Sequence, residues 1–201
     1  IQVSKYLVTN SMFCEFLNVF PYNYVEGDSY YIFNCINTNN AIQYDVKSQQ
    51  YFVKAGLEKN PVAGVNWYGA LLFAFLCDGR LITEYEYEKT VLGISRENAN
   101  FGNKYGFTTP VDYFAPNELG IYDSIGNLRV WCMDLYIPQS RYFCNKKDLK
   151  GESRYRVVKG NAWDKSSIHF DTSIHEGKWP RVGTMGIGVR VVFSDYEINF
   201  V

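Results

Sequence analysis

The chain has 201 residues, the length of one ordinary domain, and a hydrophobic fraction of 47%, which is enough for a sizeable buried core. A formal net charge of −1 argues against nucleic-acid binding, which usually requires a basic surface. The sequence contains no apolar run long enough for a membrane-spanning helix.

Five cysteines are present, an odd number, and they lack the paired spacing of a zinc site or a disulfide framework. Cys14 and Cys77 fall in helical apolar patterns, so we expect them to be free, buried thiols. Free thiols favour a reducing compartment. The sequence therefore points toward the cytoplasm without fixing the compartment.

The first third of the chain predicts short elements separated by loops. Residues 1–10 are typical of a short strand, and Thr9 or Asn10 can cap a helix with apolar residues at three- and four-residue spacing through position 17. Residues 22–60 are polar and aromatic, with alternating runs that predict a hairpin or a loop-rich insert. A second helix is expected after Pro61, ending near Gly79.

The rest of the chain predicts little regular structure. A short helix is expected at residues 84–90, and short strands at 130–133, 156–159 and 189–193, with Gly, Pro and Asn marking turns between them. No linker or internal repeat divides the chain, so we expect one domain over residues 1–201. Helices followed by a loop-dominated half predict an α+β fold.

The most specific motif spans residues 120–131, G-I-Y-D-S-I-G-N-L-R-V-W. It resembles the G-L-Y-D-M-x-G-N-V-x-E-W signature of the formylglycine-generating enzymes, also called the sulfatase-modifying factor family. Further segments are similar to motifs of that family in the same chain order: residues 5–10 (K-Y-L-V-T-N), 60–70 (N-P-V-A-G-V-N-W-Y-G-A), 80–88 (R-L-I-T-E-Y-E-Y-E), 156–163 (R-V-V-K-G-N-A-W) and 188–192 (G-V-R-V-V).

This resemblance implies a C-type-lectin-like fold that is loop-rich and low in regular secondary structure. Such a fold hosts enzymes, ligand binders and protein-recognition modules, so it does not decide the function. Within the motifs we expect three core aromatic residues, Trp67, Trp131 and Trp163. We also expect a buried charged network made of Arg80, Glu84 and Glu88.

The chain departs from the family at the copper site. The aerobic enzymes carry two cysteines shortly after their G-G-S-W motif, and these bind copper and activate oxygen. Aligning Trp163 with that motif places Lys165 and Phe170 at the two positions, and no cysteine follows Cys144. Lysine is not a soft ligand and phenylalanine is no ligand at all. Copper is disfavoured, and we expect no sulfatase-activating oxidase activity.

The calcium positions implied by the resemblance are also altered. The acidic residue of the signature falls at Val130, and another acidic ligand is replaced around Tyr105. Calcium requires several oxygen ligands, with carboxylates supplying the charge. A weak calcium site that uses Asn100 and backbone carbonyls remains open.

Both histidines of the chain lie in the same segment as the altered copper positions. His169, Asp171 and His175 are candidates for a two-histidine, one-carboxylate iron site. The other interpretation, which we favour, is a solvated polar loop whose histidines have no ligand role. The cofactor is therefore undetermined, with calcium or iron open.

We predict that the domain binds a protein or small-molecule ligand through its C-terminal loops and has no catalytic residues of the oxidase type. Tryptophan and arginine are frequent interface anchors, and the candidate binding residues are Asp164, Lys165, His169, Trp179 and Arg181. We expect residues 169–181 to form an exposed, irregular loop beside a concave surface. The alternative function is a metal-dependent oxidoreductase or biosynthetic tailoring enzyme, which the metal content of the purified protein would distinguish.

Overall fold

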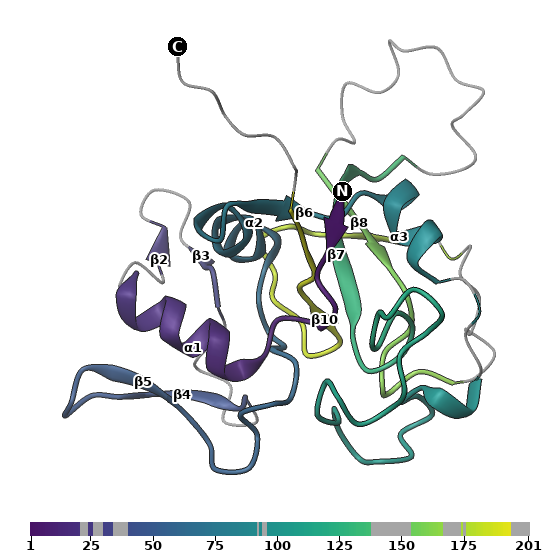
Figure 1. Ribbon diagram of the computed structural model, residues 1–201. Coiled ribbons are helices and arrows are strands. Elements are labelled where there is room, and N and C mark those ends of the chain that lie inside the picture. The colour runs from purple at the N-terminus through teal and green to yellow at the C-terminus, as the bar shows by residue number, and fades with distance from the viewer. Residues whose placement is uncertain are drawn as a thin grey trace, which may run out of the picture.

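Figure 1 shows a computed structural model of the chain. It describes residues 1–20, 31–33, 40–91, 93, 97–137, 154–166, 174 and 176–193, and the backbone alone of residues 24, 25, 30 and 96. The described part is a mixed helix and strand structure joined largely by loops, which confirms the predicted α+β class. None of the described helices is long and apolar enough to cross a membrane.

Two helices and two hairpins build the N-terminal part (Figure 1). Their bounds are α1 (Asn10–Val19), α2 (Trp67–Leu76), β2 (Tyr24–Val25), β3 (Tyr30–Tyr31), β4 (Ile42–Asp45) and β5 (Gln50–Val53). The hydroxyl of Thr9 accepts a bond from the Met12 amide at 3.3 Å and caps α1. The side-chain oxygen of Asn66 accepts one from the Gly69 amide at 2.8 Å and caps α2. Both caps satisfy first-turn amides, which fixes where each helix begins.

Two small sheets hold the remaining elements together. The first has the order β1-β11-β6 and is antiparallel, and the second has the order β10-β7-β8-β9, in which only the β10–β7 pair is parallel. The bounds are β1 (Gln2–Val3), β6 (Gly79–Leu81), β7 (Arg129–Leu135), β8 (Arg156–Lys159), β9 (Glu176–Lys178), β10 (Ile187–Gly188) and β11 (Val191–Phe193), with α3 (Glu84–Thr90) and a 3-10 turn (Arg96–Asn98) beside them. The β1–β11 pair brings the two ends of the domain together (Figure 1).

Two buried tryptophans join β7 to the segment that leads into α2. Trp131 is completely buried, and its indole nitrogen donates to the Val65 carbonyl at 3.0 Å. Trp67 is also buried and donates to the Cys132 carbonyl at 2.8 Å. Each ring contributes apolar contact while its single polar atom stays hydrogen-bonded. The prediction that these two rings lie in the core is confirmed, whereas the third ring, that of Trp163, is only partly buried and packs against the edge of the core.

The expected network of Arg80, Glu84 and Glu88 is wrong in its pairing. Arg80 is partly exposed and makes a two-armed ion pair with Glu86, at 2.7 and 2.5 Å. Glu84 and Glu88 instead hold the ammonium of Lys159, at 3.2 and 2.9 Å. The cause is helical geometry, because residues 84 and 88 are one turn apart on the face of α3 that meets β8.

The predicted burial of the two thiols is half right. Cys14 lies buried on α1, whereas Cys77 is exposed. The difference follows from position, because Cys77 is the residue at which α2 ends and so lies beyond the helix face that packs on the core.

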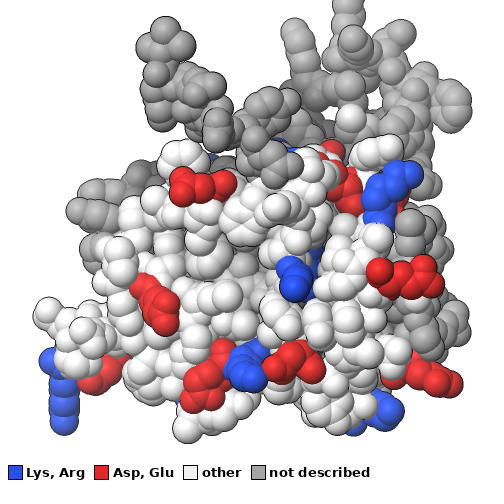
Figure 2. Space-filling model, viewed as in Figure 1, with Lys and Arg blue, Asp and Glu red and all other residues white. Residues whose placement is uncertain are grey.

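Surface charge is scattered over the face seen in Figure 2, where acidic and basic side chains lie close to one another. Ion pairs such as Lys59 with Asp112, at 2.9 Å, are typical of that arrangement. The face offers no broad basic stripe of the kind that binds nucleic acid.

Truncating Trp131 to alanine should cost about 3–5 kcal/mol of unfolding free energy, because it removes a fully buried ring and leaves a cavity. Trp179, which is partly exposed, provides the matched control, and Trp179→Ala should cost clearly less. Urea denaturation of both variants measures the difference. Equal losses would contradict the assignment of Trp131 to the core.

Candidate functional site

A polar cavity of about 370 Å³ lies where β7 and β9 flank the loop that follows β8. Its described lining residues are Arg129, Gly160, Asn161, Lys165, Ile174, Glu176 and Lys178. The chain enters the loop through Gly160, which has φ +93°. A Cβ there would lie 2.7 Å from the hydroxyl of Tyr87, so only glycine fits this turn.

An acidic side chain between two cations forms one wall of the cavity. The carboxylate of Glu176 accepts from the guanidinium of Arg129 with one oxygen and from the ammonium of Lys178 with the other. Burial alone would raise the pKa of Glu176, but the hydrogen bond from Lys178 and the charge of Arg129 outweigh it and lower that pKa. Glu176 is therefore ionised near neutral pH and keeps the Arg129 side chain, which is 12% exposed, in place.

Lys165 supplies the third cation of the cavity. Its ammonium lies 3.4 Å from the carboxylate of Asp164, and both side chains are about two-fifths exposed. Such an exposed pair is weak, so the ammonium can turn toward a ligand at little cost. Two backbone bonds fix the loop itself, since the Gly102 amide donates to the Lys165 carbonyl at 2.6 Å and the Asn103 amide to the Trp163 carbonyl at 2.7 Å.

Among the sequence-predicted binding residues that the structure describes, one lines this cavity. Lys165 lines it, with Asp164 beside it. Trp179 packs edge-on against Tyr155 with ring centroids 5.6 Å apart and does not line the cavity. Arg181 is exposed in the turn that follows.

The remaining candidates, His169, Asp171 and His175, lie outside the described residues, and an iron site there stays a prediction. The expectation of an irregular loop over 169–181 needs correction, because Glu176–Lys178 forms strand β9, paired antiparallel with β8.

Sequence reasoning missed the walls of the cavity. Arg129 occupies a variable position inside the 120–131 motif, and Glu176 and Lys178 lie almost 50 residues further along the chain. The one available signal was the spacing of Glu176 and Lys178, which places both side chains on the same face of a strand.

The described residues do not form a copper donor set at the cavity. The described thiols of the chain are those of Cys14, Cys77 and Cys132, and none of them lines the cavity. The described part of the chain also contains no group of three or more His, Cys, Asp and Glu side chains placed to hold a metal. The ammonium group of Lys165 offers hydrogen-bond donors and no acceptor, so it cannot serve as a metal ligand.

Two of the positions named for calcium, Asn100 and Val130, are buried, beside the signature residue Asn127. Asn127 is completely buried, and its amide donates to the Thr109 carbonyl at 2.9 Å and to Asp123 at 3.0 Å. Val130 is buried in apolar surroundings where the signature has an acid. The side-chain oxygen of Asn100 is buried without a partner in the described residues. This oxygen is one of the several that calcium needs, and a weak site that adds backbone carbonyls to it stays a prediction.

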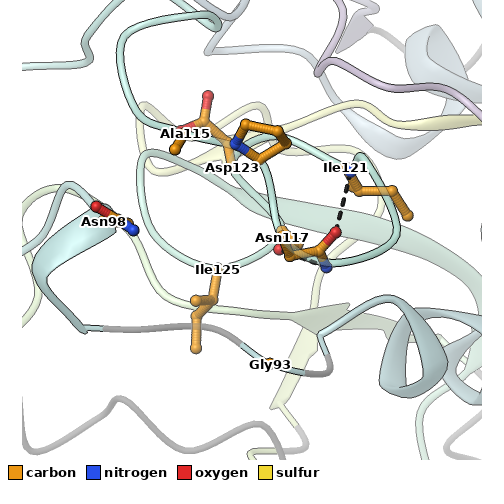
Figure 3. Close-up of a pocket in the computed structure, with 9 residues that line it drawn as sticks. Gly93, Asn98, Ala115, Asn117, Ile121, Asp123 and Ile125 are labelled. Carbon is orange, nitrogen blue, oxygen red and sulfur yellow. Dashed lines mark hydrogen bonds between the residues drawn. The ribbon is translucent and has the colours of Figure 1, made fainter.

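A second, much smaller cavity lies against Asp123 and is drawn in Figure 3. Its volume is about 20 Å³, which suits a single water molecule and excludes a substrate. Asn117 closes one side, where its side-chain oxygen accepts from the Ile121 amide at 3.0 Å (Figure 3). Burial raises the pKa of Asp123 to about 7, although the bond from Asn127 and the charge of Arg190 both act to lower it.

Comparison with known proteins was informative at the level of family. The model of the family described as "Sulfatase-modifying factor enzyme 1-like domain" matches residues 1–194. The serine/threonine-protein kinase Pkn1 of Chlamydia trachomatis serovar L2 is 31% identical in an alignment of length 175 that covers 78% of this chain and 27% of the kinase. The chain thus spans about a quarter of that relative's length. A formylglycine-generating enzyme of Thermomonospora curvata is 30% identical in an alignment of length 101 that covers 37% of this chain and 33% of the enzyme.

Among solved structures, PvdO from Pseudomonas aeruginosa superposes with a TM-score of 0.65 at 19% identity, covering 94% of this chain and 78% of PvdO. At that identity the likeness establishes the fold alone, and it agrees with the predicted C-type-lectin-like architecture of low regular structure.

The titration of Asp123 should make stability depend on pH. Above the ordinary pKa of 3.8 the unfolded chain releases a proton that the folded chain keeps up to about pH 7, so the unfolding free energy falls with rising pH over that interval and levels off above it. Asp123→Asn removes the titrating group and retains an oxygen that accepts from Asn127. Its stability relative to wild type should rise between pH 4 and pH 7, by about 1.4 kcal/mol per unit of pKa shift. Urea unfolding at several pH values measures this, and a pH-independent difference would contradict it.

Proposed function

Because the chain belongs to the sulfatase-modifying factor enzyme 1-like family, we propose that it is a binding module built on that family's fold and that it does not oxidise cysteine. The observation that carries this proposal is the position of Lys165. It lines the polar cavity at the place where the family resemblance puts the first copper-binding cysteine.

The chemistry of the cavity supports binding over oxidation. Oxygen activation by copper requires soft ligands, and an ammonium group at this place offers a hydrogen-bond donor with positive charge instead. A cavity of about 370 Å³ is large enough for a side chain or a small molecule. Its described walls contain no nucleophile paired with a base, so they provide a recognition surface without covalent chemistry.

The charges of the walls indicate the class of ligand. Arg129, Lys165 and Lys178 are cationic and Glu176 is the acid that lines the cavity with them, so the described lining carries a positive excess. Glu176 already accepts from Arg129 and from one N–H of the Lys178 ammonium. The other N–H donors of Lys178 and those of Lys165 can therefore bind a ligand. We propose that the ligand presents an acidic group, either on a protein segment or on a small molecule.

The relation to longer proteins is consistent with a recognition role. The region matched in Chlamydia trachomatis Pkn1 is about a quarter of a chain that is named as a kinase. A domain of this kind can supply specificity to a longer polypeptide, as loops on a rigid scaffold commonly do.

The absence of oxidase activity is directly measurable. We expect that a Cys-x-Pro-x-Arg peptide incubated with the protein and copper acquires no formylglycine, because Lys165 replaces a required ligand. Mass spectrometry of the peptide detects the aldehyde. Conversion above the level of a reaction without protein would refute this part of the proposal.

Binding is tested by selection from a random peptide library. Wild-type protein should enrich peptides rich in Asp and Glu, and Lys165→Glu should abolish that enrichment, because it reverses the charge of the cavity wall. Lys47→Glu makes the same change of charge in the exposed β4–β5 turn and serves as the matched control, which should enrich like wild type. Equal enrichment by both variants would show that acidic peptides bind elsewhere.

A further inference from the structure

The polar cavity is lined by nitrogen donors from three separate elements. Arg129 begins β7, Lys165 lies in the loop that follows β8, and Lys178 ends β9. In the described part of the chain, the ammonium of Lys165 pairs with Asp164 and that of Lys178 pairs with Glu176. Each ammonium has three N–H donors, so both keep donors for a ligand.

Arg129 adds a donor that is held in place. Its Nη1 donates to Glu176, and its Nε donates to the Gly186 carbonyl at 3.5 Å. Its Nη2 has no hydrogen-bond partner among the described residues. A Cβ at position 186 would lie 3.3 Å from Nη2, so the glycine leaves one side of this nitrogen uncovered. Because Glu176 fixes the guanidinium, Nη2 is a rigid donor beside two mobile ammonium groups.

The charges of the lining leave two cations to be balanced by a ligand. The carboxylate of Glu176 offsets the charge of Arg129, and the ammonium groups of Lys165 and Lys178 remain. Asp164 lies beside Lys165, but its side chain is about two-fifths exposed, so water screens much of its charge. A carboxylate would balance one of the two ammonium groups. A phosphoryl group, with a charge of about −1.5 to −2 near neutral pH, would balance both.

We propose that the acidic group bound in this cavity is a phosphoryl group, which accepts from Nη2 of Arg129 and from the ammonium groups of Lys165 and Lys178. The inference rests on the proposed function, which requires only an acidic ligand. A phosphate ester has three terminal oxygens at the corners of a tetrahedron, whereas a carboxylate has two oxygens in one plane. Three donors from three elements can therefore each have an oxygen of their own on a phosphoryl group. A protein segment or a small molecule can carry that group.

The first test compares two capped peptides, acetyl-Gly-phosphoserine-Gly-amide and acetyl-Gly-Glu-Gly-amide, by NMR titration of the full 201-residue chain. At pH 7.5 the phosphoserine peptide should bind about tenfold more tightly, because its additional charge meets a second ammonium group. Equal affinities would overturn this inference and leave the proposed function standing. Failure of both peptides to bind would contradict the proposed function as well.

The preference for phosphoserine should also depend on pH. The second pKa of a phosphate ester is about 6 and the pKa of a glutamate side chain is about 4.3, so at pH 5 the first ligand has lost most of its second charge and the second ligand is still ionised. The charged groups that face the ligand are Arg129, Lys165, Lys178, Glu176 and Asp164. The pKa of Glu176 is lowered by the bond from Lys178 and the charge of Arg129, so this residue stays ionised at both pH values. The ratio of the two affinities should fall several-fold at pH 5, and a ratio that does not change with pH would overturn the proposal.

Variants locate the bound group. Arg129→Lys keeps a positive charge beside Glu176 but removes the rigid donor, so the ratio of affinities should move toward one. Arg154→Lys makes the same change at an exposed arginine outside the cavity lining, and it should keep the wild-type ratio. An unchanged ratio in Arg129→Lys would overturn the part assigned to Nη2. Lys165→Glu should abolish phosphoserine binding, and binding that persists in this variant would place the phosphoryl group elsewhere. The NMR spectrum of each variant shows whether it is folded.

A last comparison separates the two sources of the phosphoryl group. Glycerol phosphate is titrated beside the phosphoserine peptide, and inorganic phosphate is added as a competitor of both. Similar affinities would assign the site to a small phosphorylated molecule, and clearly tighter binding of the peptide would assign it to a phosphorylated protein segment. Both results support the inference, which concerns the phosphoryl group itself. Failure of inorganic phosphate to displace either ligand would overturn it.

Discussion

The guanidinium of Arg190 is the contact on which the rest of the structure depends. Arg190 is completely buried and donates to the carbonyls of Ser4 and Lys5 at 2.8 and 3.2 Å, and to those of Tyr122 and Asp123 at 2.6 and 3.1 Å. Burial lowers its pKa to about 10, which still leaves it charged near neutral pH. A buried charge is tolerated when most of its donors are satisfied, and here backbone carbonyls accept from both terminal nitrogens of the guanidinium, while its Nε is buried without a partner among the described residues. This one side chain, placed between β10 and β11, thereby joins the signature loop to the segment that follows β1.

The signature loop passes this constraint on to the polar cavity. Asp123 and Asn127 both have positive φ, and their side chains are hydrogen-bonded to each other at 3.0 Å. The Asn127 carbonyl accepts from the Trp163 amide at 3.0 Å, which places the loop that ends in Lys165. The position of the cavity wall therefore follows from a series of side-chain and backbone hydrogen bonds that begins at Arg190. This explains how a loop-rich domain holds charged side chains in a defined arrangement without long strands or helices.

Much of this fold is predictable from local sequence, because its helices are specified locally. Thr9 and Asn66 cap the first two helices as short polar side chains do, and apolar spacing gives their buried faces. Most of the signature forms loops, and hydrophobic periodicity predicts only helices and strands. The loop-rich architecture was therefore predictable only from the family resemblance. The buried positions of Trp67 and Trp131 followed from the same motifs.

The remaining features depend on contacts between residues far apart in the chain. Arg129 and Glu176 are 47 positions apart, and nothing near either residue indicates the other. Arg80 has three possible acidic partners on α3, and only the tertiary position of β8 assigns Glu84 and Glu88 to Lys159 and leaves Glu86 for Arg80. Sequence reasoning found Lys165 because a missing cysteine drew attention to its position. It missed Arg129 and Lys178 because neither residue replaces a ligand that the family resemblance leads one to expect.

The most direct test of the binding proposal is an NMR titration of protein with ¹³C-methylated lysine amines, using a capped tri-aspartate peptide as the probe. Each lysine then gives its own signal, and a change in a signal reports ligand close to that amine. The account predicts that the signals of Lys165 and Lys178 shift together and saturate, while that of Lys47 in the β4–β5 turn does not move. Saturable shifts at other lysines with Lys165 unaffected, or no response of Lys165 at all, would contradict the proposal that this cavity is the binding site.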